Sequence, residues 1–167
     1  MNLRAPSLLL AFAGALCLFG PAPRVLAQTR PASTIPSAAL IAPADLAARL
    51  EQGTTTKPLV LQVGFRVLFD QAHIPDAEFA GPASKDEGLA LLRARVAKLP
   101  REAPIVIYCG CCPWSRCPNI AAAYDALHVL GFTHVRVLHI REDFDQDWVK
   151  AGYPVRRGTV QELHHAS

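Results

Sequence analysis

The chain has 167 residues, of which 51% are hydrophobic and 19% are charged, a composition typical of a globular protein and unlike that of a disordered one. Its formal net charge is +3, without a run of Lys or Arg and without basic and aromatic residues interleaved, so no nucleic-acid partner is expected. The length suits one domain with its own hydrophobic core.

Residues 1–27 are predicted to be a secretion signal. Arg4 supplies a positive start, residues 7–20 form an apolar run, and Val25-Leu26-Ala27 is a small-residue cleavage site. Because the apolar run is short for a bilayer span, we expect cleavage after Ala27 and no stable membrane insertion afterwards. The predicted location is the periplasm or the exterior of the cell, and a retained membrane anchor is the alternative.

After the signal, the sequence predicts a flexible leader over residues 28–40, a folded domain over 41–158 and a C-terminal tail over 159–167. In chain order, the domain is expected to contain a helix at Pro43–Leu50, a strand at Leu59–Val63, a helix that follows a capping box at Ser84–Glu87 and ends at Pro100, a strand at Pro104–Tyr108, a helix at Pro118–Leu130, a strand at Val135–Ile140 and a helix at Phe144–Ala151. Strands that alternate with helices, without hairpin turns, favour an α/β domain with a mostly parallel central sheet.

Four of the five cysteines lie within nine residues, directly after the strand Pro104–Tyr108. An apolar strand that ends in Cys109, followed by a loop and by Pro118 at the start of a helix, directs backbone N–H groups and the positive helix end at a sulfur. Such a site favours thiolate, the form that attacks and binds metals. Cys109 is therefore predicted to be a reactive thiol, with a buried structural disulfide as the alternative.

In their order and spacing, four segments of the chain resemble a single-domain rhodanese. They are Leu59–Val63, Ala72-His73-Ile74-Pro75-Asp76-Ala77, Ile105–Cys109, and Trp148 with Ala151–Val155. The resemblance implies a three-layer α/β rhodanese-like fold, with helices on both faces of the sheet. It also implies that Cys109 carries a persulfide, cradled by main-chain N–H groups of residues 110–117, and passes sulfane sulfur from a small donor to a thiol or cyanide acceptor without a cofactor.

Three features depart from the pattern of that family. The loop after Cys109 is longer than usual, Gln62 stands where a carboxylate is usual, and Ile140-Arg141-Glu142-Asp143 replaces paired glycines. A bulky, partly acidic segment beside a thiolate disfavours anionic substrates. Ser115 occupies the position at which the related dual-specificity phosphatases need an arginine, which argues against phosphatase activity.

The remaining residues of the loop leave alternatives open. Cys109 and Cys112 form a C-x-x-C pair typical of thiol–disulfide redox proteins, and Cys111, Cys112 and Cys117 are the possible resolving or bridging cysteines. A non-catalytic module that holds its thiols free, or binds copper(I) or zinc through them, is the third interpretation, although the main prediction assigns no metal. The expected substrate-loop residues are Gly110, Trp114, Ser115 and Arg116, with Trp114 as packing or a lid, and with Arg116 either as a cation near the bound sulfur or as a solvent-exposed loop residue. No protein partner is indicated.

Overall fold

The computed structural model describes residues 35–52 and 57–158, together with Met1. Residues 2–27 of the predicted secretion signal, residues 28–34 of the predicted leader and the tail after residue 158 lie outside the described residues. Within the described part of the chain, no helix has the length and apolar character needed to cross a membrane.

Five parallel strands form the central sheet, in the order β1-β5-β4-β2-β3. Their bounds are β1 (Leu40–Ile41), β2 (Leu59–Gln62), β3 (Glu78–Phe79), β4 (Ile105–Tyr108) and β5 (Val135–Leu138). All four residues of β4 are buried, as its continuous apolar sequence predicts for a central strand of a parallel sheet. The predicted α/β class with a mostly parallel sheet is confirmed.

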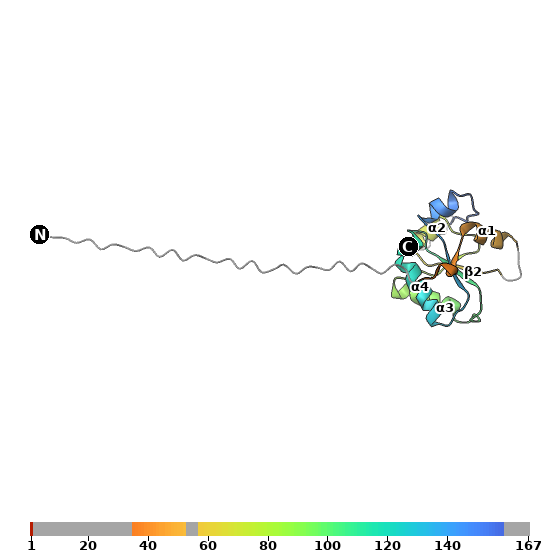
Figure 1. Cartoon of the computed structure of the whole chain (residues 1–167), viewed down its shortest axis with the longest axis horizontal. Coiled ribbons are helices and arrows are strands. Elements are labelled where there is room, and N and C mark those ends of the chain that lie inside the picture. Colours follow the sequence, from red (N-terminus) through yellow and green to blue (C-terminus); the bar gives the residue numbers. More distant parts are fainter. Residues whose placement is uncertain (2–34, 53–56, 159–167) are drawn as a thin grey trace. The chain divides into compact units, whose positions relative to one another are not determined.

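Helices cover both faces of this sheet, so the domain has three layers (Figure 1). The α-helices are α1 (Pro43–Glu51), α2 (Arg66–Gln71), α3 (Asp86–Val96) and α4 (Pro118–Val129), and the short helical segments are η1 (Ser37–Ala39), η2 (Trp114–Arg116) and the π-helical η3 (Asp145–Val149). One buried cluster joins the sheet to α3 and α4, through residues such as Leu92 and Leu127. The other joins the opposite face to α1 and η3, through Leu46 and Trp148.

The amino-terminal boundary lies earlier than the predicted start at residue 41. Ile35 and Ala39 are buried in the cluster beneath α3 and α4, and Leu40 pairs with Val137 of β5. The last residues of the predicted leader therefore pack on the domain. Their apolar side chains are too few to show a period, which is why the sequence pattern missed them.

The capping box predicted at Ser84–Glu87 is absent, although the helix that should follow it is present. The N-cap residue of α3 is Lys85, whose side chain makes no capping hydrogen bond. The backbone N–H of Ser84 instead donates to Asn119 Oδ1 over 2.9 Å. A tertiary contact with α4 thus takes the place of the local cap.

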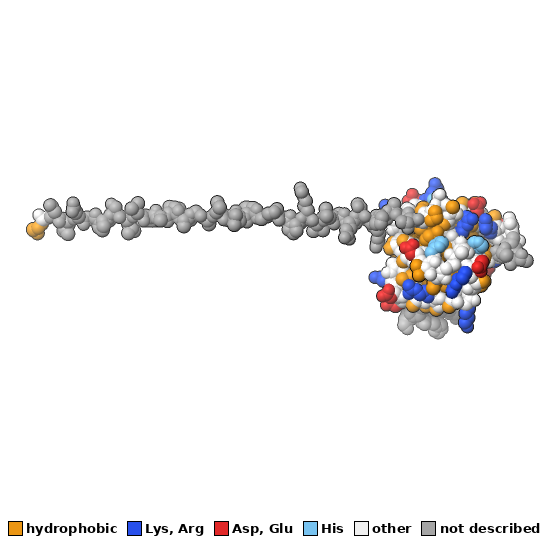
Figure 2. Space-filling model, turned by 60° about the horizontal axis from the view of Figure 1, so that its bottom comes forward, with side chains coloured by type: hydrophobic (Ala, Val, Ile, Leu, Met, Phe, Trp, Pro, Cys, Tyr) orange, Lys and Arg blue, Asp and Glu red, His pale blue; other side chains and the backbone are white. Residues whose placement is uncertain are grey.

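Side chains of both charges are interspersed on the face drawn in Figure 2. This distribution agrees with the small net charge of +3 and shows no continuous basic stripe on that face.

Candidate active site

The turn after β4 places Cys109 at the carboxyl end of the central strand. Its side chain is buried, with 3% of its surface exposed. Gln62, at the end of the neighbouring strand β2, donates from Nε2 to the Cys109 carbonyl oxygen over 2.9 Å. Gln62 Oε1 accepts from the backbone N–H of Gly64 over 3.2 Å. The amide that replaces the usual carboxylate therefore ties together the turns that follow β2 and β4.

Gly64 packs directly against the sulfur of Cys109. A Cβ atom on Gly64 would lie 2.7 Å from Cys109 Sγ and 2.9 Å from the Cys109 carbonyl oxygen, closer than side-chain carbons approach other atoms. Only a residue without a side chain fits here unless the cysteine shifts. Gly64 thus forms one wall of the site, and its role is one that the sequence pattern does not reveal.

A side-chain amide supplies the N–H at the sulfur. Asn119 is 1% exposed and donates from Nδ2 to Cys109 Sγ over 3.5 Å, while its Oδ1 accepts from Ser84. Among the described residues, no backbone N–H of the loop donates to this sulfur within hydrogen-bond distance. The cradle of main-chain donors expected from the rhodanese resemblance is therefore absent in this structure, and the N–H groups of Trp114, Arg116 and Cys117 donate to backbone carbonyl oxygens instead.

The other three cysteines of the loop gather around Cys109. The Sγ atoms of Cys109, Cys111 and Cys117 all lie within 4.8 Å of one another, and that of Cys111 is 3.2 Å from Cys109. Cys112 Sγ is 3.2 Å from Cys111 Sγ but is not part of that group of three. All four are free thiols. The structure thus places the thiol of Cys111, and not that of the predicted Cys112, in contact with Cys109.

The environment raises the pKa of the three cysteines around Cys109. Desolvation raises the pKa of Cys111 to about 12, and it also raises the pKa of Cys112. The pKa of Cys117 is raised mainly by its hydrogen bond with Cys109, and then by burial. These three groups are consequently thiols, not thiolates, at neutral pH.

The predicted loop residues have different positions. Gly110 has a φ of +94°, which favours glycine, and its carbonyl oxygen accepts from Phe144 N over 3.1 Å. Trp114 is half-buried, donates its backbone N–H to the Ile140 carbonyl oxygen over 2.9 Å and packs edge-on against His139. Ser115 and Arg116 are exposed. Trp114 therefore packs, while Arg116 acts electrostatically on Cys112, whose pKa it lowers slightly against the larger effect of burial.

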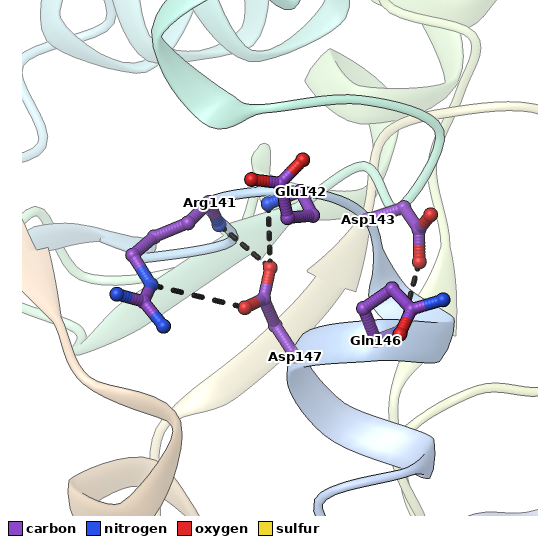
Figure 3. A network of polar contacts seen from close by, with 5 residues as sticks. All are labelled: Arg141, Glu142, Asp143, Gln146 and Asp147. Carbon is purple, nitrogen blue, oxygen red and sulfur yellow. Dashed lines mark hydrogen bonds and ion pairs between the residues drawn. The ribbon is translucent and has the colours of Figure 1, made fainter.

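Residues 140–143, which replace the paired glycines, belong to a turn whose carboxylates bond to its own backbone (Figure 3). Asp147 Oδ2 accepts from the backbone N–H groups of Arg141 and Glu142, each over 2.7 Å. Asp143 Oδ1 accepts from the backbone N–H of Gln146 over 2.8 Å. These carboxylates are held by their own segment, so the acidic residues of the turn have local structural partners.

A cavity of about 410 Å³ opens beside this turn. It is lined by Leu68, Gln71, Ala72, Gly110, Cys111, Asp143, Phe144, Asp145, Val149 and Arg157. Cys111 is exposed and lines the cavity, whereas Cys109 lies behind it. A small molecule in the cavity would meet the Cys111 thiol, the carboxylates of Asp143 and Asp145, and the guanidinium group of Arg157.

Comparisons with known proteins find similarity at the level of structure. No family model matches the chain, and no curated protein sequence matches it. The Alr3790 protein from Anabaena sp. superposes with a TM-score of 0.55 at 20% identity, covering 76% of this chain and 100% of that one. Another structure of that protein, described as its rhodanese-like domain, gives a TM-score of 0.53 at 22% identity over 74% of this chain and 81% of that one. This chain has the rhodanese-like fold.

One structural neighbour with the same fold is named for its enzymatic activity. Thiosulfate sulfurtransferase from Pseudomonas aeruginosa superposes with a TM-score of 0.53 at 18% identity, covering 72% of this chain and 20% of that longer one. At such identities the likeness establishes the rhodanese-like fold, and the chemistry depends on the residues of this chain. A rhodanese-like fold with clustered free cysteines at the end of β4 supports a thiol-based activity in general.

Proposed function

We propose that this protein is a sulfurtransferase in which Cys109 carries sulfane sulfur between a small donor and a thiol or cyanide acceptor. The observation that carries the proposal is the position of Cys109: a free thiol at the carboxyl end of the central strand, where α/β folds bind ligands, with Asn119 Nδ2 at its sulfur. An N–H donor stabilises the negative charge on sulfur that attack requires.

The reaction has two displacement steps. With thiosulfate as donor, the Cys109 thiolate attacks the outer sulfur, the S–S bond of thiosulfate breaks, and sulfite leaves with the bonding electron pair. Cys109 then carries a persulfide. Cyanide attacks the outer sulfur of that persulfide, forms thiocyanate and returns the Cys109 thiolate, and a thiol acceptor takes the sulfur in the same way.

Access to Cys109 supports a small donor. The thiol is 3% exposed, Gly64 packs against its sulfur, and Cys111, whose sulfur lies 3.2 Å away, lines the neighbouring cavity. The cavity presents charges of both signs, because Asp143, Asp145 and Arg157 line it. Because the thiol is so little exposed, we expect a small sulfane-sulfur donor to be used faster than a bulky one.

Two single substitutions test the proposal. Cys109→Ser removes the nucleophile and should abolish sulfur transfer to cyanide. Cys112→Ser is the matched control, because Cys112 contacts Cys111 and not Cys109, so it should retain sulfur transfer within a few fold. Transfer at wild-type rate by Cys109→Ser would contradict the proposal.

Thiol–disulfide exchange is a second candidate, favoured by the 3.2 Å separation of Cys109 Sγ and Cys111 Sγ. In that reaction one thiolate attacks a substrate disulfide and the second resolves the mixed disulfide, so both cysteines become oxidised and the substrate is reduced. Cys111→Ser should then eliminate turnover of a protein disulfide, whereas Cys112→Ser should not. Unchanged turnover in Cys111→Ser would exclude this candidate.

The proposed site of action is the periplasm or the exterior of the cell, reached through the predicted signal at residues 1–27.

A further inference from the structure

Three sulfur atoms of the loop have the spacing of a metal-binding trio. The Sγ atoms of Cys109, Cys111 and Cys117 lie within 4.8 Å of one another, with 3.2 Å between the first two. Metal–thiolate bonds of about 2.3 Å place the sulfurs of a planar three-coordinate ion about 4 Å apart. Small rotations of the cysteine side chains are therefore enough to bring all three onto one ion.

Different parts of the fold hold these ligands. Cys109 follows β4 and is tied to β2 through Gln62, and Cys117 is the N-cap residue of α4. Both are buried, with 3% and 2% of their surfaces exposed. Cys111 is exposed and lines the cavity beside the site. The arrangement combines two fixed ligands with one that an arriving ion can reach from solvent.

The donor set selects among metals. In the described part of the chain, no histidine or carboxylate joins the three sulfurs, and the fourth thiol, Cys112, lies 3.2 Å from Cys111 but outside the group of three. Zinc in structural sites is almost always bound by four protein ligands, whereas thiolates are the soft ligands that copper(I) prefers. Asn119 Nδ2 provides an outer N–H to the Cys109 sulfur, the type of second contact that orients a metal ligand.

We infer that Cys109, Cys111 and Cys117 form a binding site for one copper(I) ion per chain. Binding replaces thiol protons by the ion, which stays monovalent, so the protons go to solvent and no electron is transferred. Since the ion uses the Cys109 sulfur, a copper-loaded chain cannot form the Cys109 persulfide. The inference goes beyond the proposed function, because the ion binds whether or not the protein transfers sulfur.

The test is an anaerobic titration of the reduced full chain with copper(I) against a chromophoric copper(I) chelator, without a sulfur donor. One equivalent should bind, and X-ray absorption should show three sulfur neighbours around the ion and no other ligand atoms. Removing an outer partner of a metal ligand weakens binding roughly 10- to 100-fold, so Cys109→Ser, Cys111→Ser and Cys117→Ser should each lose more than that. Cys112→Ser keeps a hydroxyl group beside the ligand Cys111, so it is the comparison variant and should lose less affinity than any of these three.

Cys111→Ser should fold normally, because Cys111 is exposed and its replacement leaves the core unchanged. A loss of copper(I) binding in this variant therefore reports on the site and not on folding. Wild-type affinity in Cys111→Ser, or equal losses in Cys112→Ser and Cys109→Ser, would overturn the three-cysteine site. Tighter binding of zinc than of copper(I) would overturn the choice of ion. Sulfur transfer by the metal-free protein is measured separately, so a negative copper result leaves the proposed function standing.

Discussion

The buried amide of Asn119 joins the sulfur of Cys109 to the turn before α3. It donates to Cys109 Sγ over 3.5 Å and accepts from Ser84 N over 2.9 Å. Asn119→Ala removes both hydrogen bonds. We expect the free energy of unfolding to fall by about 1–2 kcal/mol in urea denaturation. We also expect slower alkylation of Cys109 by iodoacetamide, because the charge that develops on sulfur loses its N–H partner.

Thr133→Ala is a suitable control for this experiment. The Thr133 hydroxyl donates to the Arg101 carbonyl oxygen at an exposed position that is not part of the thiol cluster. Its loss should leave Cys109 alkylation unchanged. If Asn119→Ala lowers stability and yet Cys109 reacts at the wild-type rate, the amide has only a structural role.

At the scale of single residues, the sequence predicts the reactive thiol but not its surroundings. Cys109 is predictable because a buried strand directly precedes it and a helix follows the loop. Asn119 is not, since its partner Ser84 lies 35 positions away and no local pattern connects them. Cys111 is predicted as a bridging residue, and its contact with Cys109 depends on the positive φ of Gly110 between them.

The turn after β2 forms a wall of the site that follows β4, and Gly64 is the point of closest contact. Gly64→Ala would place a Cβ 2.7 Å from Cys109 Sγ, so the cysteine or the turn must shift. Overpacking of this kind costs about 1–3 kcal/mol of stability. The displaced sulfur should load with sulfane sulfur more slowly, as followed by stopped-flow measurement with a persulfide donor.

Gly152→Ala is the control for Gly64→Ala, because it makes the same substitution at a glycine away from the cysteines. Gly152 has a φ of +84°, and a Cβ atom added there would have no neighbour within 4 Å, so alanine costs about 1–2 kcal/mol through backbone strain alone. Both variants should lose stability, but only Gly64→Ala should slow sulfur loading. Equal loading rates in the two variants would contradict the role given to Gly64.

Elements with long periodic sequences are predictable, and elements held by distant partners are not. The residues of α3, α4 and β4 carry their own helical or apolar patterns, and the sequence predicts each close to its observed bounds. β1 and β3 contain two residues each and exist through pairing with β5 and β2. A two-residue strand has no period to detect.

For the whole molecule, the order of strands and helices is sufficient to predict a parallel three-layer domain. Right-handed crossovers between parallel strands leave few ways to arrange such a chain, which is why the resemblance of four short segments leads to the observed fold. The cradle around the sulfur is not predictable in the same way. It depends on the path of the longer loop, which is fixed in part by the distant hydrogen bond from the Trp114 N–H to the Ile140 carbonyl oxygen.

Export is a prediction about the whole chain. Expression of the full sequence in a bacterium should yield a processed protein in the periplasmic fraction or the medium, beginning at Gln28, because Val25 and Ala27 satisfy the small-residue rule. N-terminal sequencing measures this. Recovery of a membrane-bound product that still begins at Met1 would contradict cleavage.

The central claim is that Cys109 itself carries the transferred sulfur. The most direct measurement is the intact mass of the reduced protein after brief incubation with a persulfide donor, followed by peptide mapping. The account predicts one added sulfur atom in wild type and in Cys112→Ser, mapped to Cys109, and none in Cys109→Ser. An added sulfur that persists in Cys109→Ser, or that maps to another cysteine in wild type, would contradict it.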